Sequence, residues 1–426
     1  MSRIAVIGTG IAGLGAAWAL HHQHDITVYE AGNYIGGHSN TVEIDHGGTR
    51  IPVDTGFIVY NTVTYPNLIA LFEHLGVPTE PSDMSFAVQR DGGRLEWAGT
   101  DLGTIFAQRR NLANPRFLRM LAHIVRFGRQ APLDLASGRL AGRSLGDYLV
   151  AGRYGPGFRD DYLLPMGACI WSSSNERMLD FPAETFVRFC VNHHLLDVGK
   201  RPPWRTVTGG SREYVRRLTA GFRDRIRLNT PVGAIRRDAG GVTVHAADGQ
   251  TARFDQVVVA THADQALRLL VEPSRAEREI LGAIRFQPNR AVLHRDPGLM
   301  PNARKVWSSW NCFADGDDAG GRVVSLTYWM NRLQNLDARH QVFVSLNPRR
   351  APRDEFVFAA FDYEHPLFDA GAGVAQARLG EIQGVCRTWF CGAWCGYGFH
   401  EDGLKAGLAV AEQLGFARPW AEALAA

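Results

Sequence analysis

Two short apolar runs near the start of the chain flank a segment with helical periodicity. The runs are Ile4–Ile7 and Ile26–Tyr29, and the segment between them is Leu14–Leu20. A short continuous apolar run is typical of a strand buried on both faces, as in a parallel sheet. The pattern therefore predicts a strand, a helix and a second strand, in the order of a parallel βαβ unit.

The pattern of the chain changes twice further on. Residues 63 to about 200 look mainly helical, and from about 270 to 385 long aromatic runs favour an antiparallel sheet. The predicted helices are Tyr65–Leu75, Phe106–Gly128, Ser144–Val150, Arg159–Cys169, Ala183–Leu195 and Leu404–Leu414. The predicted sheet strands are Arg304–Asn311, Val323–Asn331 and Phe356–Phe361, and a hairpin is expected around Asp248–Gly249.

Glycines with a fixed spacing follow the first predicted strand, and an acid ends the second. They read Gly8-x-Gly10-x-x-Gly13, with Glu30 further on. Gly8 permits a tight turn, Gly10 lets the backbone approach a pyrophosphate, and Gly13 lets the helix pack close to the strand. A helix N-terminus attracts phosphate charge, and an acid about 20 residues on suits a ribose hydroxyl. We therefore predict a Rossmann-type dinucleotide site.

Three later segments could complete such a site. Gly36-Gly37-His38 follows Glu30, and Gly56 lies beside the apolar Phe57–Val59. Glycines in these places let the backbone lie against a ligand. The alternatives are an ordinary turn for the first segment and a buried strand with a glycine bulge for the second. The third segment, 389–403, precedes the last helix, where we expect Asp402 as the N-cap.

Composition narrows the class of protein. The chain has 426 residues, 45% of them hydrophobic, and a net charge of +3, which is too small to argue for nucleic-acid binding. No run of about 18 apolar residues occurs, and the chain starts directly on a core strand, so we expect neither a membrane span nor a signal peptide. Six scattered cysteines without a CxxC pair predict reduced thiols in the cytoplasm and no metal site.

One predicted helical stretch is strongly basic. Arg109–Arg129 holds six arginines among apolar residues and no acid. Such a helix can lie on an anionic bilayer, which would make the protein peripheral to the inner membrane face. It can equally cap a core and turn its arginines to water. The sequence leaves both interpretations open.

Over the full chain, the sequence resembles the FAD-dependent amine oxidase superfamily. Within it, the chain is similar to bacterial NAD/FAD-binding proteins that resemble the N-terminal half of plant cyclopropane-fatty-acid synthases. The segments that carry this likeness are 36–42, 54–61, 328–334 and 396–403. The resemblance implies FAD and an α/β fold with two interleaved domains. A Rossmann-type FAD-binding domain with a parallel sheet would comprise 1–62, 203–268 and 385–426, and an α+β substrate domain would combine a helical cap (63–202) with an antiparallel sheet (269–384).

The motifs and the resemblance together assign residues to the cofactor. The expected FAD contacts are Gly8, Gly10, Ile11, Ala12, Gly13, Glu30, Ala31, Gly36, Gly37, His38, Gly56, Phe57, Ile58, Val232, Thr261, Gly392, Phe399, Glu401, Asp402 and Gly403. In the superfamily the N-terminus of the last helix points at the flavin N1 and C2 carbonyl. His262 follows a predicted strand end, but we interpret it as a solvated loop residue.

The chain departs from the superfamily at two places. His38 stands where an arginine is usual, and Ala393 where an acid is usual. FAD binding is compatible with both changes, but they put amine-oxidation chemistry in doubt. Cys391 and Cys395 lie in the flavin-facing segment. The surrounding pattern does not match the oxidases that bind flavin covalently, so we expect a non-covalent cofactor.

We expect hydride transfer between flavin N5 and a carbon of an apolar substrate, because the predicted pocket segments hold few charges. The resemblance points to unsaturated or methyl-branched acyl chains of lipids, and to a lipid methyltransferase as a partner. The catalytic candidates are His400, Glu401 and Tyr328, and the substrate-pocket candidates are Tyr60, Asn61, Trp310 and Trp329. The alternatives are a redox-neutral fatty-acid isomerase, an amine oxidase, a polyene desaturase and a non-catalytic FAD-binding partner of a lipid methyltransferase.

Overall fold

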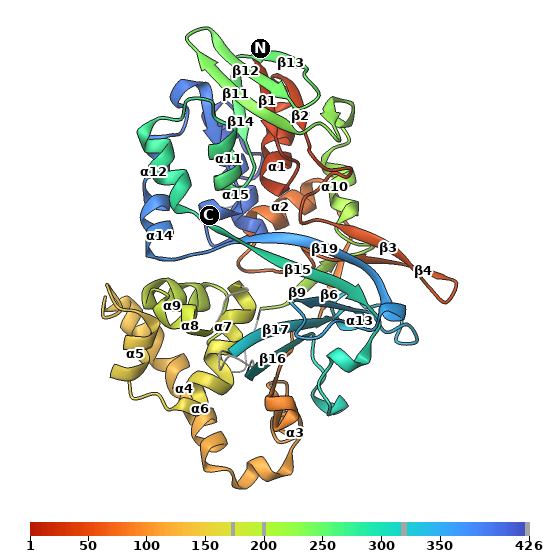
Figure 1. Ribbon diagram of the computed structural model, residues 1–426, viewed down its shortest axis with the longest axis vertical. Helices are drawn as coiled ribbons and strands as arrows, with labels where there is room; N and C mark the ends of the chain where they lie inside the picture. Colours follow the sequence, from red (N-terminus) through yellow and green to blue (C-terminus); the bar gives the residue numbers. More distant parts are fainter. Residues whose placement is uncertain (172–174, 198–201, 317–321, 422–426) are drawn as a thin grey trace.

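A five-stranded parallel sheet forms one half of the molecule (Figure 1). The computed structural model describes residues 1–171, 175–197, 202–316 and 322–421, so parts of the predicted cap and sheet ranges lie outside the described residues. The strand order is β10 (Ile226–Arg227), β2 (Asp25–Tyr29), β1 (Arg3–Ile7), β14 (Gln256–Val259) and β20 (Thr388–Phe390), and every pair is parallel. This order brings strands from both ends of the chain into one sheet.

Both faces of the parallel sheet are covered, because alternate residues of a strand point to opposite sides. Ile4 and Val6 of β1 pack in a core with α1 (Ile11–Leu20), α15 (His400–Gln413), α2 (Pro66–His74) and α10 (Arg212–Leu218). Ala5 and Ile7 pack on the other face with α11 (Ala263–Leu269), α12 (Arg275–Ala283) and α14 (Ala370–Ala377). The continuous apolar run of β1 is thereby explained.

A seven-stranded sheet forms the second half, in line with the predicted α/β fold. Its order is β19 (Val357–Pro366), β15 (Phe286–His294), β18 (Phe343–Leu346), β17 (Arg322–Trp329), β16 (Trp310–Gly316), β7 (Phe86–Arg90) and β8 (Leu95–Ala98). The sheet is mixed rather than purely antiparallel, because β16 and β7 run parallel. Arg304–Val306 forms a short 3-10 turn, so the strand predicted from Arg304 begins only at Trp310.

Residues 79–98 correct the prediction of a mainly helical segment. They form β6 (Thr79–Ser82), β7 and β8, and the last two join the large sheet. Val88 and Trp97 pack on one side of the sheet, whereas Ala87 and Ala98 pack on the other. This two-sided burial hides the alternation of polar and apolar residues that marks a half-exposed strand. The division of the chain into domains stays a prediction.

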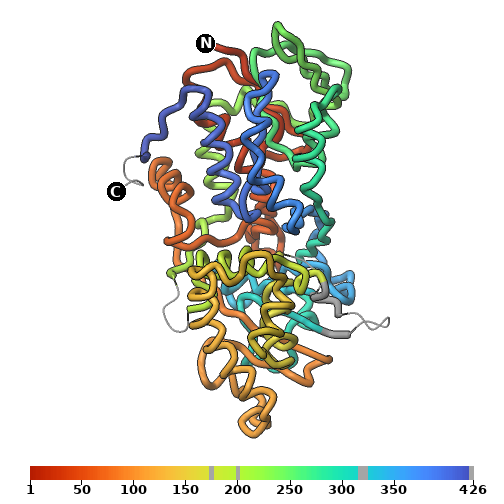
Figure 2. The backbone as a smooth tube through the Cα atoms, turned by 90° about the vertical axis from the view of Figure 1, so that its left-hand side faces the viewer, coloured from red at the N-terminus to blue at the C-terminus, as the bar shows by residue number. Residues whose placement is uncertain are grey.

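Three smaller sheets accompany the two large sheets. They are β5 (Val59–Asn61), β9 (Trp204–Val207) and β6 in one sheet, β3 (Thr41–His46) and β4 (Thr49–Asp54) in another, and β11 (Val232–Asp238), β12 (Gly241–Ala246) and β13 (Thr251–Phe254) in a third. The predicted hairpin at Asp248–Gly249 is the turn between β12 and β13. In Figure 2 the chain passes between the two halves several times.

The helical cap comprises α3 (Leu102–Ile105), α4 (Pro115–Ala136), α5 (Leu145–Ala151), α6 (Pro156–Phe158), α7 (Leu164–Trp171), α8 (Asn175–Asp180) and α9 (Ala183–Asn192). The helix predicted from Phe106 begins at Pro115, because Asn114 caps it with its side chain. The helix predicted from Arg159 opens with a π-helical turn, Arg159–Leu163. Among the described residues, no helix combines the length and apolarity that a bilayer crossing needs.

Candidate active site

One large cavity runs from the glycine-rich turn after β1 to the helical cap. Its volume is about 2130 Å³, well above the roughly 300–1,000 Å³ that is usual for a ligand site. Its walls come from both ends of the chain, from the strand ends of the parallel sheet, from the large sheet and from the cap. The cavity therefore has room for an extended ligand and a second molecule.

The first end of the cavity is built by the N-terminus of α1. Gly10 is the N-cap residue, and a Cβ added to it would meet nothing within 4 Å, so open space lies before the helix. Gly37 has a φ of +59°, and its added Cβ would come within 3.0 Å of the Gly10 Cα. The two glycines thus form a close backbone cradle at a helix end, where N–H groups attract an anion. Ile11 and Ala12 line the same wall.

Glu30 lies in this wall, and the protein itself fixes its carboxylate. Its Oε2 accepts hydrogen bonds from the backbone N–H (2.9 Å) and the hydroxyl of Thr9, and its Oε1 accepts one from the Gly32 N–H (2.8 Å). The Oε1 atom, which accepts only one of these bonds, has a further lone pair. Glu30 is therefore held in place and can still accept a bond from a ribose hydroxyl.

Three of the predicted FAD contacts, Gly13, Gly36 and Gly403, do not line the cavity. They lie at close approaches between segments around it. A Cβ on Gly13 would lie 2.0 Å from the Gly8 carbonyl oxygen, and one on Gly36 would lie 2.6 Å from that of Ser39. A Cβ on Gly403 would lie 2.8 Å from Cγ2 of Ile11. These glycines bring segments close together. The predicted positions that do line the cavity are Gly8, Gly10, Ile11, Ala12, Glu30, Ala31, Gly37, His38, Gly56, Phe57, Ile58, Val232, Thr261, Gly392 and Phe399.

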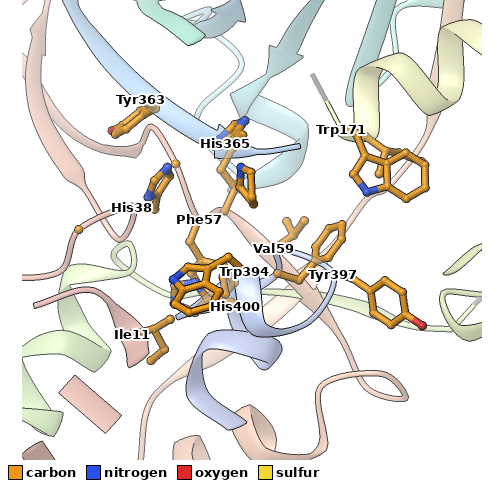
Figure 3. A pocket seen from close by; sticks show the side chains of 18 of the residues that line it. Ile11, His38, Phe57, Val59, Trp171, Tyr363, His365, Trp394, Tyr397 and His400 are labelled. Atoms are coloured by element: carbon orange, nitrogen blue, oxygen red, sulfur yellow. The ribbon is translucent and has the colours of Figure 1, made fainter. Parts of the chain in front are cut away.

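His400, at the first position of α15, lines the cavity beside Phe57 (Figure 3). Its ring stacks on Phe57 with centroids 3.8 Å apart. Its Nε2 lies 2.7 Å from the Tyr214 hydroxyl and 3.2 Å from the Ser39 hydroxyl. Burial lowers the pKa of His400 to about 3. The imidazole is therefore neutral at physiological pH and serves as a hydrogen-bonding group.

A second group of histidines lies beside the glycine pair. The ring of His38 stacks on Tyr363 at 4.8 Å and lies 5.5 Å from the ring of His365. Burial, and then the neighbouring His365, hold the pKa of His38 well below its usual value. The Nε2 of His38 is buried and has no hydrogen-bond partner among the described residues. A buried polar atom of this kind needs a partner, and a bound ligand can supply one.

The interpretation of His262 as a solvated loop residue is wrong. His262 lines the cavity, its ring stacks on Phe286 at 4.3 Å, and its Nδ1 lies 3.2 Å from the Glu364 carboxylate. The sequence pattern of β14 placed it at a strand end. The stacking partner comes from a strand that lies far away in the sequence, so local patterns could not reveal it.

Glu401 and Asp402 do not line the cavity, which corrects their assignment to catalysis and to direct cofactor contact. Glu401 accepts hydrogen bonds from the Asn67 N–H and side chain and from the Leu68 N–H, at the N-terminus of α2. Asp402 lies at the third position of α15 and accepts a bond from the Phe399 N–H. It caps the helix from inside the first turn, instead of serving as the N-cap residue.

The far end of the cavity is apolar and aromatic. Tyr328 and Trp310 line it and pack edge-on, with centroids 5.5 Å apart. The other side chains of this end are Phe86, Trp97, Leu121, Ile124, Val125, Phe127, Tyr162, Met166, Ile170, Trp171 and Phe189. Burial, and then Cys169, raise the pKa of Tyr328, so its phenol keeps its proton.

Three predicted pocket residues do not reach this cavity. Tyr60 packs edge-on against Tyr65 and Phe72 in the core of the parallel-sheet half. Asn61 is fully buried and bonds the Val63 and Thr64 backbone N–H groups. Trp329 donates to the Gln341 side chain. Strand alternation and the turn after β5 direct them away, so these predictions are wrong.

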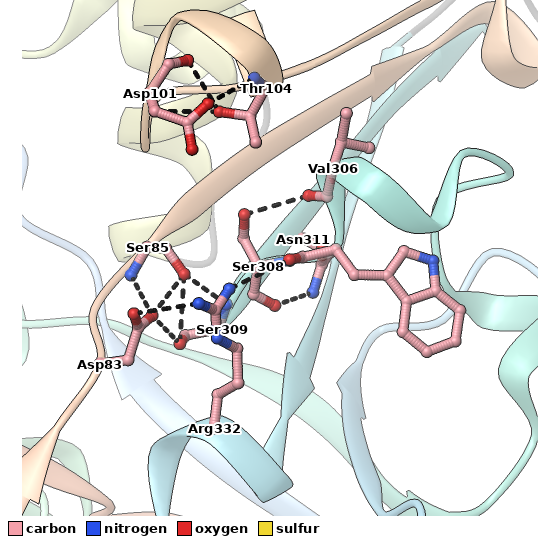
Figure 4. A network of polar contacts seen from close by, with 10 residues as sticks. Asp83, Ser85, Asp101, Thr104, Val306, Ser308, Ser309, Asn311 and Arg332 are labelled. Atoms are coloured by element: carbon pink, nitrogen blue, oxygen red, sulfur yellow. Dashed lines mark hydrogen bonds and ion pairs between the residues drawn. The ribbon is translucent and has the colours of Figure 1, made fainter. Parts of the chain in front are cut away.

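One carboxylate in the apolar half is already paired with neighbouring side chains (Figure 4). Asp83 lines the cavity and accepts hydrogen bonds from the hydroxyls of Ser85 and Ser309, and Arg332 lies 3.5 Å from its Oδ2. Burial by itself would raise the pKa of Asp83, but the bonds from Ser309 and Ser85 hold it below its usual value. Asp83 is thus an ionised group with its charge already paired.

The observed residues fit a flavin dinucleotide. Open space before α1, the Gly10–Gly37 cradle, the fixed Glu30 and the unpartnered Nε2 of His38 follow one another along one wall. Phe57, His400 and Trp394 continue it with flat rings, as Figure 3 shows. Trp394 also donates to the Thr261 carbonyl, which ties the last segment to the end of β14.

Cys391 and Cys395 do not line the cavity, and burial raises the pKa of Cys395 to about 12.

Residues 11–332 match the family of flavin containing amine oxidoreductases. The chain belongs to this family. The family's description names a flavin, and FAD is the cofactor that membership implies. Proteins from two strains of Mycobacterium tuberculosis, provisionally named flavin-containing monoamine oxidase AofH, are 30% identical over 272 residues. That match covers 60% of this chain and 56% of theirs, so the chain spans little more than half the length of these curated relatives.

Solved structures of several flavoenzymes share the fold. Cyclohexylamine oxidase from Brevibacterium oxydans is similar with a TM-score of 0.70 at 16% identity, over 97% of this chain and 99% of that one. A fatty acid isomerase from P. acnes that produces CLA gives 0.67 at 16%, over 97% and 99%. Putrescine oxidase bound to putrescine gives 0.66 at 17%, over 97% and 98%. These likenesses confirm the predicted fold class and do not assign a substrate.

Proposed function

We propose that this enzyme oxidises or reduces the acyl chain of a lipid, with unsaturated or methyl-branched chains as the substrate class. The observation that carries the proposal is the continuity of the cavity. A polar cradle with a fixed carboxylate opens directly into a space walled by aromatic and aliphatic side chains. A substrate that enters this space loses water contact along its whole length, which favours an apolar chain.

The carboxylate in the apolar half of the cavity is not available to a protonated amine. A buried substrate ammonium group is stabilised by a carboxylate whose charge is unpaired. In the apolar half Asp83 is already bonded by two serines and faces Arg332. His400 is neutral and offers only hydrogen bonding. Amine oxidation stays the main alternative, because it is the activity named for relatives and structural neighbours.

The chain's own residues perform three tasks in this proposal. The N-terminus of α1 with Gly10 and Gly37 holds the pyrophosphate, and Glu30 binds a ribose hydroxyl. The His400–Tyr214–Ser39 hydrogen bonds fix one edge of the site. The cap helices exclude water from the acyl chain. Bound FAD supplies hydride exchange with a substrate carbon at its N5 atom.

Further parts of the proposal come from the resemblance. We place the chain in the branch similar to the N-terminal half of plant cyclopropane-fatty-acid synthases. On this basis a lipid methyltransferase that modifies unsaturated acyl chains is the proposed partner. The proposed site of action is the cytoplasm or the inner face of the membrane, where both proteins meet their lipids.

A comparison of cellular lipids tests the proposal and separates it from a scaffolding role. Lipids are analysed by mass spectrometry in cells that carry the wild-type protein, the Gly10→Val variant or none. The valine side chain would fill the open space before α1, so this variant should fold and fail to bind FAD. We expect a change in acyl unsaturation or branching with the wild type alone. An unchanged lipid profile contradicts the proposal, and a change that Gly10→Val also produces supports the non-catalytic partner.

A further inference from the structure

The end of the molecule farthest from the N-terminus carries an unusual surface, which we call the basic lobe and define as residues 99–136 (Figures 1 and 2). It comprises α3, a 3-10 turn (Arg109–Ala113) and α4. Large apolar side chains are exposed all along it. They are Leu102 (74%), Leu112 (58%), Leu118 (43%), Val125 (38%) and Leu133 (63%). Single exposed leucines are ordinary, whereas a concentration of them in one segment marks an interaction site.

Five exposed residues of α4, four of them apolar, form one stripe. Leu118, Ala122, Val125, Arg129 and Leu133 are exposed and follow a spacing of four, three, four and four residues. This spacing keeps them on one face of a helix. Phe117, Met120 and Phe127, on the other side of the helix, are buried in the protein. The core therefore accounts for one face of α4, and the exposed apolar stripe needs another explanation.

Positive charge surrounds the stripe. The segment 102–133 contains six arginines and no acidic residue. Arg116 pairs with the buried Asp161, and Arg126 donates to the Gly152 carbonyl. Within the described part of the chain, no carboxylate pairs with Arg109, Arg119 or Arg129, and all three are exposed. These charges are available to an anionic partner.

The stripe adjoins the apolar end of the cavity. Leu121, Ile124 and Val125 of α4 line the cavity, and so do Gly99, Thr100 and Ile105 at the start of the lobe. Val125 is at once part of the cavity wall and 38% exposed on the outer stripe. An apolar chain held against the outside of α4 therefore lies next to the cavity's interior.

We propose that the basic lobe docks onto an anionic phospholipid bilayer and that an acyl chain enters the cavity beside Val125. The arginines would contact lipid phosphates while the leucines and Val125 enter the headgroup–acyl boundary. Acyl entry rests on the proposed function, whereas docking stands independently of it. A nucleic acid would also attract the arginines, but it offers no apolar layer for Leu102, Leu112, Leu118 and Leu133.

Vesicle flotation of the FAD-loaded protein tests docking without reference to activity. The vesicles contain either phosphatidylcholine alone or phosphatidylcholine mixed with phosphatidylglycerol. We expect binding to the mixed vesicles only, weakened by salt. Removal of an arginine near the surface should reduce partitioning about five-fold, which corresponds to about 1 kcal/mol. Arg119→Gln with Arg129→Gln should therefore reduce it about 25-fold.

The control removes two exposed arginines from the parallel-sheet half, Arg223→Gln with Arg236→Gln, and should bind as the wild type does. A third variant, Leu118→Ser with Leu133→Ser, keeps the charge and should also lose binding. Thermal unfolding and flavin content verify that all variants are folded. Equal binding by the Arg119/Arg129 variant and the wild type overturns docking, and so does tighter binding to RNA than to vesicles at the same salt concentration.

The same experiment separates the two proposals. If vesicles bind but their acyl chains are not changed, docking stands and the proposed substrate is wrong. If acyl lipid dispersed in detergent reacts but vesicles do not bind, the substrate class stands and docking is wrong.

Discussion

Two glycines of the first motif, three residues apart, serve different purposes. A Cβ on Gly10 would project into open space before α1, whereas a Cβ on Gly13 would lie 2.0 Å from the Gly8 carbonyl oxygen. Gly10 also has a φ of −64°, which any residue can adopt. The sequence motif contains both residues. It does not show that Gly10 faces the ligand space, whereas Gly13 allows close packing against Gly8.

This difference predicts opposite behaviour of two variants. Gly10→Val should leave the melting temperature of the FAD-free protein unchanged and abolish FAD binding. Gly13→Ala should lower the melting temperature, because backbone atoms must move to admit the methyl group; overpacking of this kind costs about 1–3 kcal/mol. Thermal unfolding and flavin fluorescence titration measure the two effects. Retention of FAD by Gly10→Val would show that the phosphates lie elsewhere.

Buried histidines make stability depend on pH. Burial lowers the pKa of His294 to about 4 and that of His400 to about 3, against an ordinary value of 6.5. Between pH 6.5 and about 4 the unfolded chain therefore binds protons that the folded chain does not. The free energy of unfolding must fall as the pH falls through this window, and the full stability is present above pH 6.5.

A substitution at His294 checks this dependence away from the cavity. His294 is fully buried between Ser345 and the Asp296 N–H. In His294→Gln the loss of stability between pH 6.5 and pH 4 should be smaller than in the wild type by about 3 kcal/mol, since one pKa unit is about 1.4 kcal/mol. Denaturant unfolding at a series of pH values measures it. An identical pH dependence in both proteins would mean that His294 is protonated in the fold.

At the scale of elements, α1 and α15 bring the two ends of the chain together. Gly407 of α15 faces Ala12 of α1, and a Cβ on Gly407 would lie 2.1 Å from the Ala12 carbonyl oxygen. Leu404 and Leu408 of α15 are fully buried against the same core. This close packing places His400, at the start of α15, beside Phe57. The contact between the two helices therefore positions His400 in the cavity wall.

Gly407→Ala should consequently lower the free energy of unfolding by about 1–3 kcal/mol. The matched control is Gly373→Ala in α14, where an added Cβ would meet nothing within 4 Å. That substitution should raise stability by about 0.5–1 kcal/mol through helix propensity. Both values come from denaturant unfolding. Equal stability of the two variants would contradict close packing of α1 against α15 at Gly407.

The sequence could predict what depends on neighbours along the chain. The Gly8–Gly13 turn, Glu30 at a strand end and the placement of His400 in the site follow from short motifs. It could not predict what depends on pairing across the fold. Glu401 turns to α2, His262 stacks on Phe286, and Tyr363 and His365 reach His38 from β19. Strands β7 and β8 escaped detection because both of their faces are buried.

At the scale of the whole molecule, the cavity joins two halves with different chemistry. The parallel-sheet half offers a helix N-terminus and a carboxylate, and the cap offers aromatic and aliphatic walls. The two functions should therefore be separable by substitution. Ile170 of α7 lies in the cap wall, and a larger side chain there would fill the space proposed for the acyl chain without touching the glycine cradle.

The most direct measurement is an anaerobic titration of the flavin absorbance in the wild type and in Ile170→Trp. Each protein receives an unsaturated acyl lipid, a methyl-branched acyl lipid or a long-chain primary amine. The proposed function predicts equal FAD content in both proteins, a spectral change of the wild type with an acyl lipid, and none in Ile170→Trp. A wild-type flavin that responds to the amine and to neither lipid would contradict it.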